Sequence, residues 1–272
     1  MRDDLVMSFM DDFQGSSYDQ IWLGYTATRR PDPRIATQIH EALGDARSIV
    51  NVGVNVGVNV GVGASAGAYE PCDRDVLAIE PSEEMIARRA PELAPAIRGH
   101  AESLPLAANS VDAAMACMTL HHWADWRIGV QELRRVARKR VVIFTYDHSY
   151  ANRFWLLRDY LPKLARLDCA RFPPIDEQRV ATGDEVKLEP VPIPHDCEDG
   201  FLAAYWRRPE AYLDERVRSG MPIFHMPGAE RLLGGLEVLA DDLQTGRWKD
   251  RNHDILEREE LDLGYRLLVT EL

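Results

Sequence analysis

The sequence is poor in cysteine, in positive charge and in long hydrophobic runs, and each shortage excludes a class of protein. Only four of its 272 residues are cysteines. None of them forms a C-x-x-C pair, which argues against a zinc site or a redox motif. No uninterrupted apolar run approaches the roughly 20 residues of a transmembrane helix, and the first residues lack the layout of a signal peptide. We therefore expect a globular, cytoplasmic protein with reduced thiols, no metal site and no membrane partner.

Positive charge is in the minority, because 32 lysines and arginines face 44 aspartates and glutamates, for a net charge of −12. Such a surface repels a phosphate backbone, so nucleic acid is not an expected partner. The one basic run, Arg134 to Arg140, is expected to close a helix, where cations stabilise the negative end of the helix dipole.

Short apolar runs alternate with helical stretches from Ser48 onward, which is typical of βαβ units and a parallel sheet. A first helix is expected to open at Asp32-Pro33 and to end at Gly44. Later helices are expected over residues 82–89 and 126–139, and strands over residues 76–79, 96–98, 111–118, 140–146 and 186–193. The last of these strands is expected at an edge, because its two prolines lack the N–H that a central strand needs.

The C-terminal part predicts helices over residues 195–260 and a final strand over residues 265–270. If that strand returns to the sheet, the helical part is an insertion placed to cap a pocket. The expected fold is a single Rossmann-like, doubly wound α/β domain, with a mostly parallel sheet, an antiparallel last strand and a helical cap insertion. Its expected parts are an N-terminal helical cover (1–45), a cofactor-binding core (46–194), the cap (195–260) and the last strand (261–272).

A glycine-rich repeat is the most unusual feature of the sequence. Residues 51–62 read Asn-Val-Gly-Val three times and continue into the glycine-rich stretch 63–67. A strand that runs into such a turn lets a ligand approach the backbone at the carboxyl edge of a parallel sheet. Glu80, at the end of the next strand, can then accept both hydroxyls of a ribose, which favours an adenosine-containing cofactor. The loop misses the G-x-G-x-x-G spacing, which counts against NAD. The alternative is a low-complexity expansion with no binding role.

Several motifs together resemble the class I S-adenosylmethionine-dependent methyltransferases over roughly residues 18–147. These motifs are residues 61–67 (GVGASAG), 77–82 (LAIEPS), 99–106 (GHAESLPL), 111–112 (VD) and 120–123 (LHHW). The resemblance implies S-adenosylmethionine as cofactor, with Glu80 at its ribose and Ala101 and Glu102 beside its adenine. It also implies contacts of the methionine part with the glycine loop and of an N-terminal closing helix with the cofactor, through Gly61, Gly63, Gly67, Tyr25 and Arg29.

The sequence departs from that family in three places. Asparagine stands before the glycine loop where members usually have an acid, and His100 stands where many have an acid near the adenine. About ten residues are extra, since removal of residues 54–63 would leave a loop close to the usual one. Because the repeat has an even period, the first strand can slip by one copy and keep its faces. Gly53 or Gly57 can therefore replace the three glycines named above.

Two adjacent histidines are the predicted catalytic residues. His122 is expected to act at the acceptor, as a general base or by positioning it, and His121 to support the pocket wall. Tyr205, Trp206 and His195 are predicted to contact a small-molecule acceptor, although the two aromatic residues also fit the core of the cap. Two other classes stay open, namely a cofactor-binding domain without catalysis and a nicotinamide oxidoreductase.

Overall fold

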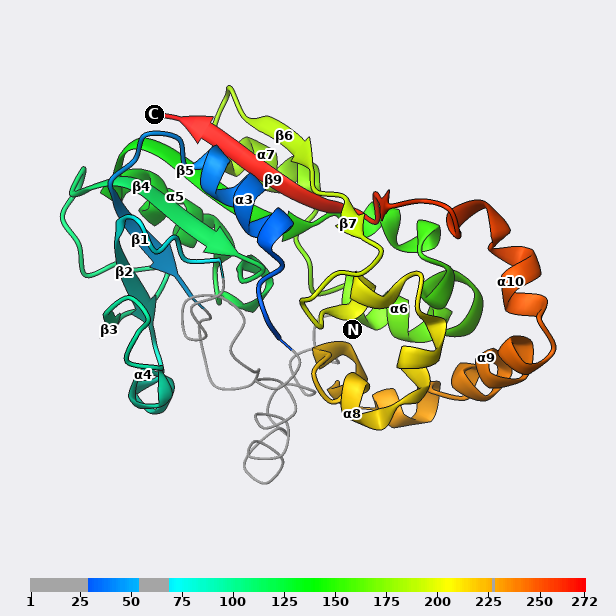
Figure 1. The fold of residues 1–272 in the computed structure, drawn as a ribbon. Helices are drawn as coiled ribbons and strands as arrows, with labels where there is room; N and C mark the ends of the chain where they lie inside the picture. The colour runs from blue at the N-terminus through cyan, green and yellow to red at the C-terminus, as the bar shows by residue number, and fades with distance from the viewer. Residues whose placement is uncertain (1–28, 54–68, 227) are drawn as a thin grey trace, which may run out of the picture.

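The computed structural model describes residues 29–53, 69–226 and 228–272. Within them a seven-stranded sheet has the order β3-β2-β1-β4-β5-β9-β6 (Figure 1). The strands are β1 (Ser48–Val52), β2 (Asp75–Glu80), β3 (Ala96–Arg98), β4 (Val111–Cys117), β5 (Ala137–Tyr146), β6 (Lys187–Pro190) and β9 (Tyr265–Glu271). Strands β1 to β5 are parallel, and β9 runs antiparallel to both β5 and β6. The predicted fold class is therefore confirmed, and β6 is the edge strand that its prolines indicated.

Helices cover both faces of this sheet. Successive side chains of a strand point to opposite faces, so consecutive buried residues need a packing layer on each face. Val142 of β5 packs in one hydrophobic cluster with helix α3 (Pro33–Ala42), and its neighbour Val141 packs in a second cluster with helix α5 (Trp126–Val136). Helix α7 (Ile175–Thr182) packs beside α5. Helix α3 begins where the sequence predicts, since the Asp32 side chain accepts a hydrogen bond from the backbone N–H of Arg34 at 3.0 Å.

The boundary between α5 and β5 differs from the prediction. Helix α5 ends at Val136, and the next residue, Ala137, is buried and already belongs to β5 opposite Val111. The basic run is therefore divided between the last helical turn and the start of the strand. In the strand, Arg138 donates to Asp112 at 2.9 Å and Arg140 donates to the carbonyl of Ala42 at 2.9 Å. These two residues therefore bind Asp112 and the C-terminal carbonyl of α3 rather than the end of α5.

The region beyond β5 consists of short helices and turns. It includes helices α6 (Pro162–Cys169), α8 (Glu215–Arg218), α9 (Gly235–Gln244) and α10 (Arg247–Arg251) and a two-stranded ribbon of β7 (Ile193–Pro194) and β8 (Glu260–Leu261). Figure 1 shows these helices gathered beyond the end of the sheet toward which β4 and β5 point. None of the described helices is long and apolar enough to cross a bilayer.

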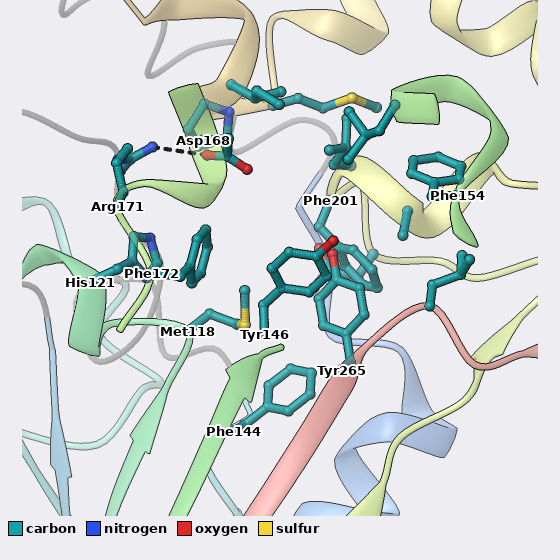
Figure 2. A pocket seen from close by; sticks show the side chains of 18 of the residues that line it. Met118, His121, Phe144, Tyr146, Phe154, Asp168, Arg171, Phe172, Phe201 and Tyr265 are labelled. Carbon is teal, nitrogen blue, oxygen red and sulfur yellow. Dashed lines mark hydrogen bonds and ion pairs between the residues drawn. The ribbon is translucent and has the colours of Figure 1, made fainter. Parts of the chain in front are cut away.

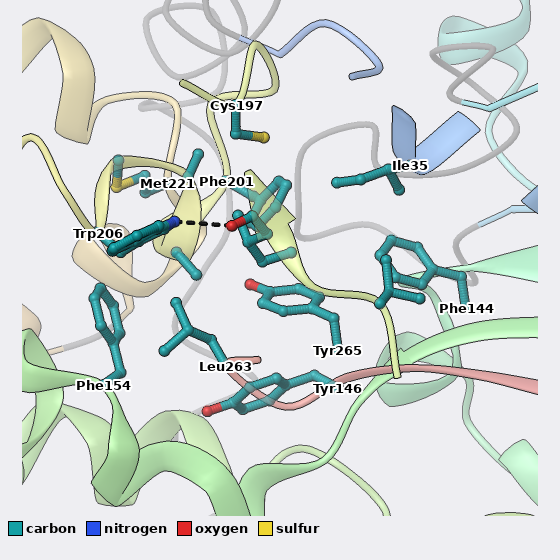
Figure 3. Packing of buried hydrophobic residues seen from close by; sticks show 14 of the residues in the cluster. Ile35, Phe144, Tyr146, Phe154, Cys197, Phe201, Trp206, Met221, Leu263 and Tyr265 are labelled. Carbon is teal, nitrogen blue, oxygen red and sulfur yellow. Dashed lines mark hydrogen bonds between the residues drawn. The ribbon is translucent and has the colours of Figure 1, made fainter. Parts of the chain in front are cut away.

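One hydrophobic cluster joins this helical region to the sheet. It runs from Ile35 and Phe144 on the α3 face to Trp206 and Met221 among the C-terminal turns (Figure 3). Two indoles fix the turns, because Trp155 Nε1 donates to the carbonyl of Trp206 at 2.8 Å and Trp206 Nε1 donates to the carbonyl of Ile193 at 2.9 Å. The helical region is thus anchored to the sheet by shared core residues.

Candidate active site

The carboxyl ends of four parallel strands meet at one edge of the sheet, where α/β proteins bind their ligands. Gly53 follows β1, Glu80 ends β2, Met118 follows β4 and Tyr146 ends β5. Glu80 is only 3% exposed as a residue, and its Oε1 accepts a hydrogen bond from the backbone N–H of Ser82 at 3.0 Å. A buried acceptor therefore stands at the position predicted for the ribose.

The described backbone shows which glycine directly follows the first strand. Gly53 donates to the carbonyl of Ile79 at 2.9 Å and accepts a hydrogen bond from Trp123 Nε1 at 2.9 Å. Gly53 belongs to the first copy of the repeat, and it is one of the two glycines that the sequence leaves open as alternatives to Gly61, Gly63 and Gly67. The predicted contacts of Gly61, Gly63, Gly67 and Tyr25 lie outside the described residues.

A buried carboxylate also lies at the end of β1, although the sequence there offers only asparagine. Asn51 Nδ2 donates to Glu70 Oε1 at 3.0 Å, and the other Glu70 oxygen is ion-paired with Arg89. We call these three residues the β1 bracket. Asn51 Oδ1 and Arg89 Nη1 are buried and have no hydrogen-bond partner in the described part of the chain. One acceptor and one donor are thus left at the edge where a polar ligand is expected.

An aromatic pocket opens beyond the ends of β4 and β5 (Figure 2). Its apolar lining comes from the sheet, from α6 with the following turn, and from the C-terminal turns. The lining residues include Met118, Phe144, Tyr146, Phe154, Phe172, Phe201, Met221 and Tyr265. Such a surface binds an apolar or aromatic molecule and keeps water away from it.

A polar cluster of His121, His122, Arg171 and Asp168 forms one wall of this pocket. Arg171 Nη2 lies 3.4 Å from His122 Nδ1, and Arg171 Nη1 lies 3.3 Å from Asp168 Oδ1. Burial and the nearby Arg171 charge lower the pKa of His122 to about 3. Burial also lowers the pKa of His121 well below its usual value. Both imidazoles are therefore neutral at neutral pH.

A second polar cluster ties three distant segments together at the pocket. Asp199 accepts hydrogen bonds from the Tyr69 hydroxyl at 2.7 Å and from Arg29 Nε at 2.5 Å. All three residues line the pocket. Tyr69 and Met118, which also line it, have positive φ values of 62° and 51°. Backbone conformations that non-glycine residues avoid concentrate at functional sites, and here two of them border one pocket.

The structure places some predicted residues on the pocket and others away from it. His121, His122 and Arg29 line it, whereas Tyr205, Trp206 and His195 do not. Trp206 is completely buried in the core, as the alternative for the aromatic residues predicted. Tyr205 packs under the guanidinium of Arg208, and His195 Nδ1 lies 3.2 Å from the carbonyl of Glu259.

The predicted adenine residues lie in the loop after β3. Ala101 is buried, and Glu102 Oε1 accepts a hydrogen bond from the backbone N–H of Asp125 at 3.0 Å. Among the described residues, no group of three or more His, Cys, Asp or Glu side chains could hold a metal ion.

Sequence reasoning missed several residues of the site. Tyr146 and Tyr265 carried a usable signal, because one is the last residue of an expected strand and the other is the first residue of the antiparallel last strand. Glu70, Asp168 and Arg171 carried none, since their positions depend on tertiary contacts.

Comparisons with known proteins agree with this geometry. Residues 54–145 match a family model described as a methyltransferase domain. A crystal structure from Anabaena variabilis, whose protein is assigned as a methyltransferase of an antibiotic biosynthesis pathway, is 34% identical with a TM-score of 0.78, covering 90% of this chain and 99% of that one.

Two further solved structures are less similar. An S-adenosylmethionine-dependent methyltransferase from Thermotoga maritima is 17% identical, with a TM-score of 0.47, and covers 65% of this chain and 81% of that one. The YcgJ protein from Bacillus subtilis is 14% identical, with a TM-score of 0.44, and covers 87% and 95%. The comparison with curated proteins returns no match. By its match to the Anabaena structure over nearly the full length of both chains, the chain belongs to the class I methyltransferases, whose cofactor is S-adenosylmethionine.

Proposed function

We propose that this chain transfers the methyl group of S-adenosylmethionine to a small-molecule acceptor held in the aromatic pocket. The observation that carries the proposal is the shared edge of the sheet. Glu80 ends β2 and Gly53 follows β1 there, and the pocket opens beyond β4 and β5 at the same edge. The assignment of the Anabaena protein to an antibiotic biosynthesis pathway also supports a small-molecule acceptor.

The described residues fit the cofactor in three respects. Glu80 would hold the ribose, Ala101 and Glu102 would lie beside the adenine, and the β1 bracket offers a free acceptor and a free donor for polar groups of the methionine part. The cofactor supplies, when bound, a methyl group on a positively charged sulfur. The protein's contribution is then to orient the acceptor and to exclude water.

His122 is proposed to position the acceptor rather than to take its proton. Its Nδ1 accepts from Arg171, so the neutral ring carries its proton on Nε2. A base whose pKa is lowered to about 3 also accepts protons poorly at neutral pH. His122 can instead donate a hydrogen bond from Nε2. The His121 ring lies 3.9 Å from the His122 ring, and the Phe172 ring lies 4.1 Å from that of His121.

Calorimetric titration with S-adenosylmethionine, its demethylated product and NAD tests the proposal. We expect the first two to bind and NAD to fail. Binding followed by methyl transfer to no acceptor in a broad panel would favour the cofactor-binding domain without catalysis, and binding of NAD alone would contradict the proposal.

A further inference from the structure

Asp168 is a largely buried carboxylate on the pocket wall that the function proposed above does not use. It lies near the end of α6, and its side chain is only 15% exposed. Oδ1 faces Arg171 Nη1 at 3.3 Å. The other oxygen makes no hydrogen bond within the described part of the chain, and Figure 2 shows it turned away from Arg171. A carboxylate oxygen that borders an aromatic pocket without a donor is ready to accept one from a ligand.

The charged and titratable groups near Asp168 leave the pocket close to electrical neutrality. Arg171, His148, Cys169, Tyr146 and Tyr265 interact with it electrostatically. Arg171 offsets the charge of Asp168, and in the second cluster Arg29 offsets the charge of Asp199. Each carboxylate is thus already balanced by an arginine, and a charged acceptor would bring a further charge without compensation into the pocket, so the pocket favours an uncharged acceptor.

The carboxylate and the two imidazoles on this wall have pKa values shifted in opposite directions. Burial raises the pKa of Asp168 in spite of the nearby Arg171, whereas burial lowers the pKa of both histidines. The carboxylate is therefore a stronger base than usual, and the imidazoles are weaker ones.

We propose, resting on the methyl transfer proposed above, that the free oxygen of Asp168 accepts the hydroxyl proton of a phenol-like acceptor, with Arg171 as a positioning residue. The aromatic walls hold the ring by stacked and edge contacts. The acceptor oxygen forms its bond to the methyl carbon while the hydroxyl proton passes to Asp168. The bond between sulfur and carbon breaks, and sulfur keeps its electron pair.

Titration with 4-nitrophenol tests this proposal without turnover, because its phenol and phenolate forms absorb at different wavelengths. We expect the wild-type protein to bind the neutral phenol and to raise its apparent pKa. Asp168→Asn leaves Arg171 facing the hydroxyl, so the bound dye should shift toward phenolate, whereas Arg171→Gln should shift it further toward the phenol. 4-Nitroanisole, which has the same ring but no proton to donate, should bind the wild-type protein about tenfold more weakly or worse.

Several results would overturn the inference. One is a bound phenolate whose spectrum Asp168→Asn leaves unchanged, and another is equal binding of 4-nitrophenol and 4-nitroanisole to the wild-type protein, a comparison that needs no variant to fold. If 4-nitrophenol does not bind to protein that binds S-adenosylmethionine, a phenol-like acceptor is excluded and this inference fails, while the proposed methyl transfer still stands. Failure of S-adenosylmethionine to bind would instead remove the proposed function.

Discussion

At the scale of single residues, His121 and His122 show how burial decides what a side chain can do. Their ring centroids are 3.9 Å apart, and each lies against apolar or cationic neighbours that disfavour a second proton. Both imidazoles are therefore neutral in the folded protein, and their protonation disfavours the folded state.

This neutral state predicts a loss of stability on acidification. The pKa of His122 is about 3 in the folded protein against 6.5 for an unperturbed histidine, so the unfolded chain binds the proton more tightly. Stability should therefore fall as the pH falls from about 6.5 toward 3. Thermal unfolding over this range should show a shallower decline for His122→Gln than for the wild type. The matched control, His253→Gln at an exposed site, should follow the wild type, and parallel curves for all three proteins would contradict the account.

The positions of the two histidines were predictable from the sequence, whereas that of Asp168 was not. His121 and His122 follow a buried apolar strand, and the ends of parallel strands meet at the ligand edge whatever the rest of the chain does. Asp168 reaches the pocket only because α6 packs against the turns that lie beyond the carboxyl end of the sheet. No local pattern encodes that contact.

At the scale of elements, the β1 bracket joins the end of β1, the residues before β2 and the end of α4 (Glu83–Arg88). Glu70 and Arg89 are each 5% exposed in their side chains. A broken buried pair leaves the remaining charge without compensation, which costs more than the intact pair contributes.

Glu70→Gln should therefore destabilise the protein by about 3 kcal/mol, because Arg89 would stay buried without its anion. Denaturant unfolding measures this free energy. The control is Glu83→Gln, which breaks the exposed pair of Glu83 and Arg98 and should cost less than about 1 kcal/mol. Equal, small effects of both substitutions would show that the bracket does not stabilise the fold.

Elements were predicted well where burial alone defines them and poorly where tertiary contacts do. The strands at 76–79 and 96–98 lie within one residue of β2 and β3, since apolar runs between turns have few alternatives. The end of α5 was misplaced by three residues, because the charged residues after Ala137 fit a helix end locally and join a strand only through Asp112 and Ala42. Within the region expected to be helical, residues 202–205 and 209–213 form 3-10 turns, and the indole hydrogen bonds of Trp155 and Trp206 hold the first of them.

At the scale of the whole molecule, the repeat lengthens the connection between the end of β1 and Glu70, and the site does not obviously require that length. The β1 bracket ties Asn51 to Glu70, one on each side of residues 54–68. The two flanks are therefore held together by contacts that do not depend on the length between them.

Removal of residues 54–63 should keep the fold and leave the affinity for S-adenosylmethionine equal or higher. Loop closure entropy changes by only about 0.6 kcal/mol per doubling of length, so a shorter connection is not penalised. Thermal unfolding and calorimetry of the deletion variant measure both properties. A variant that does not fold would show that the repeat supplies structure required elsewhere.

The central claim, that this edge of the sheet binds S-adenosylmethionine, is tested most directly by calorimetry on Glu80→Ala and Glu92→Ala. Loss of the buried acceptor should cost about 1 to 3 kcal/mol, which corresponds to a roughly 5-fold to 150-fold weaker binding. The fold should survive, because Glu80 ends β2 rather than filling its core. The control variant Glu92→Ala, changed at an exposed glutamate, should bind S-adenosylmethionine with the wild-type affinity. Wild-type affinity in Glu80→Ala would contradict the account.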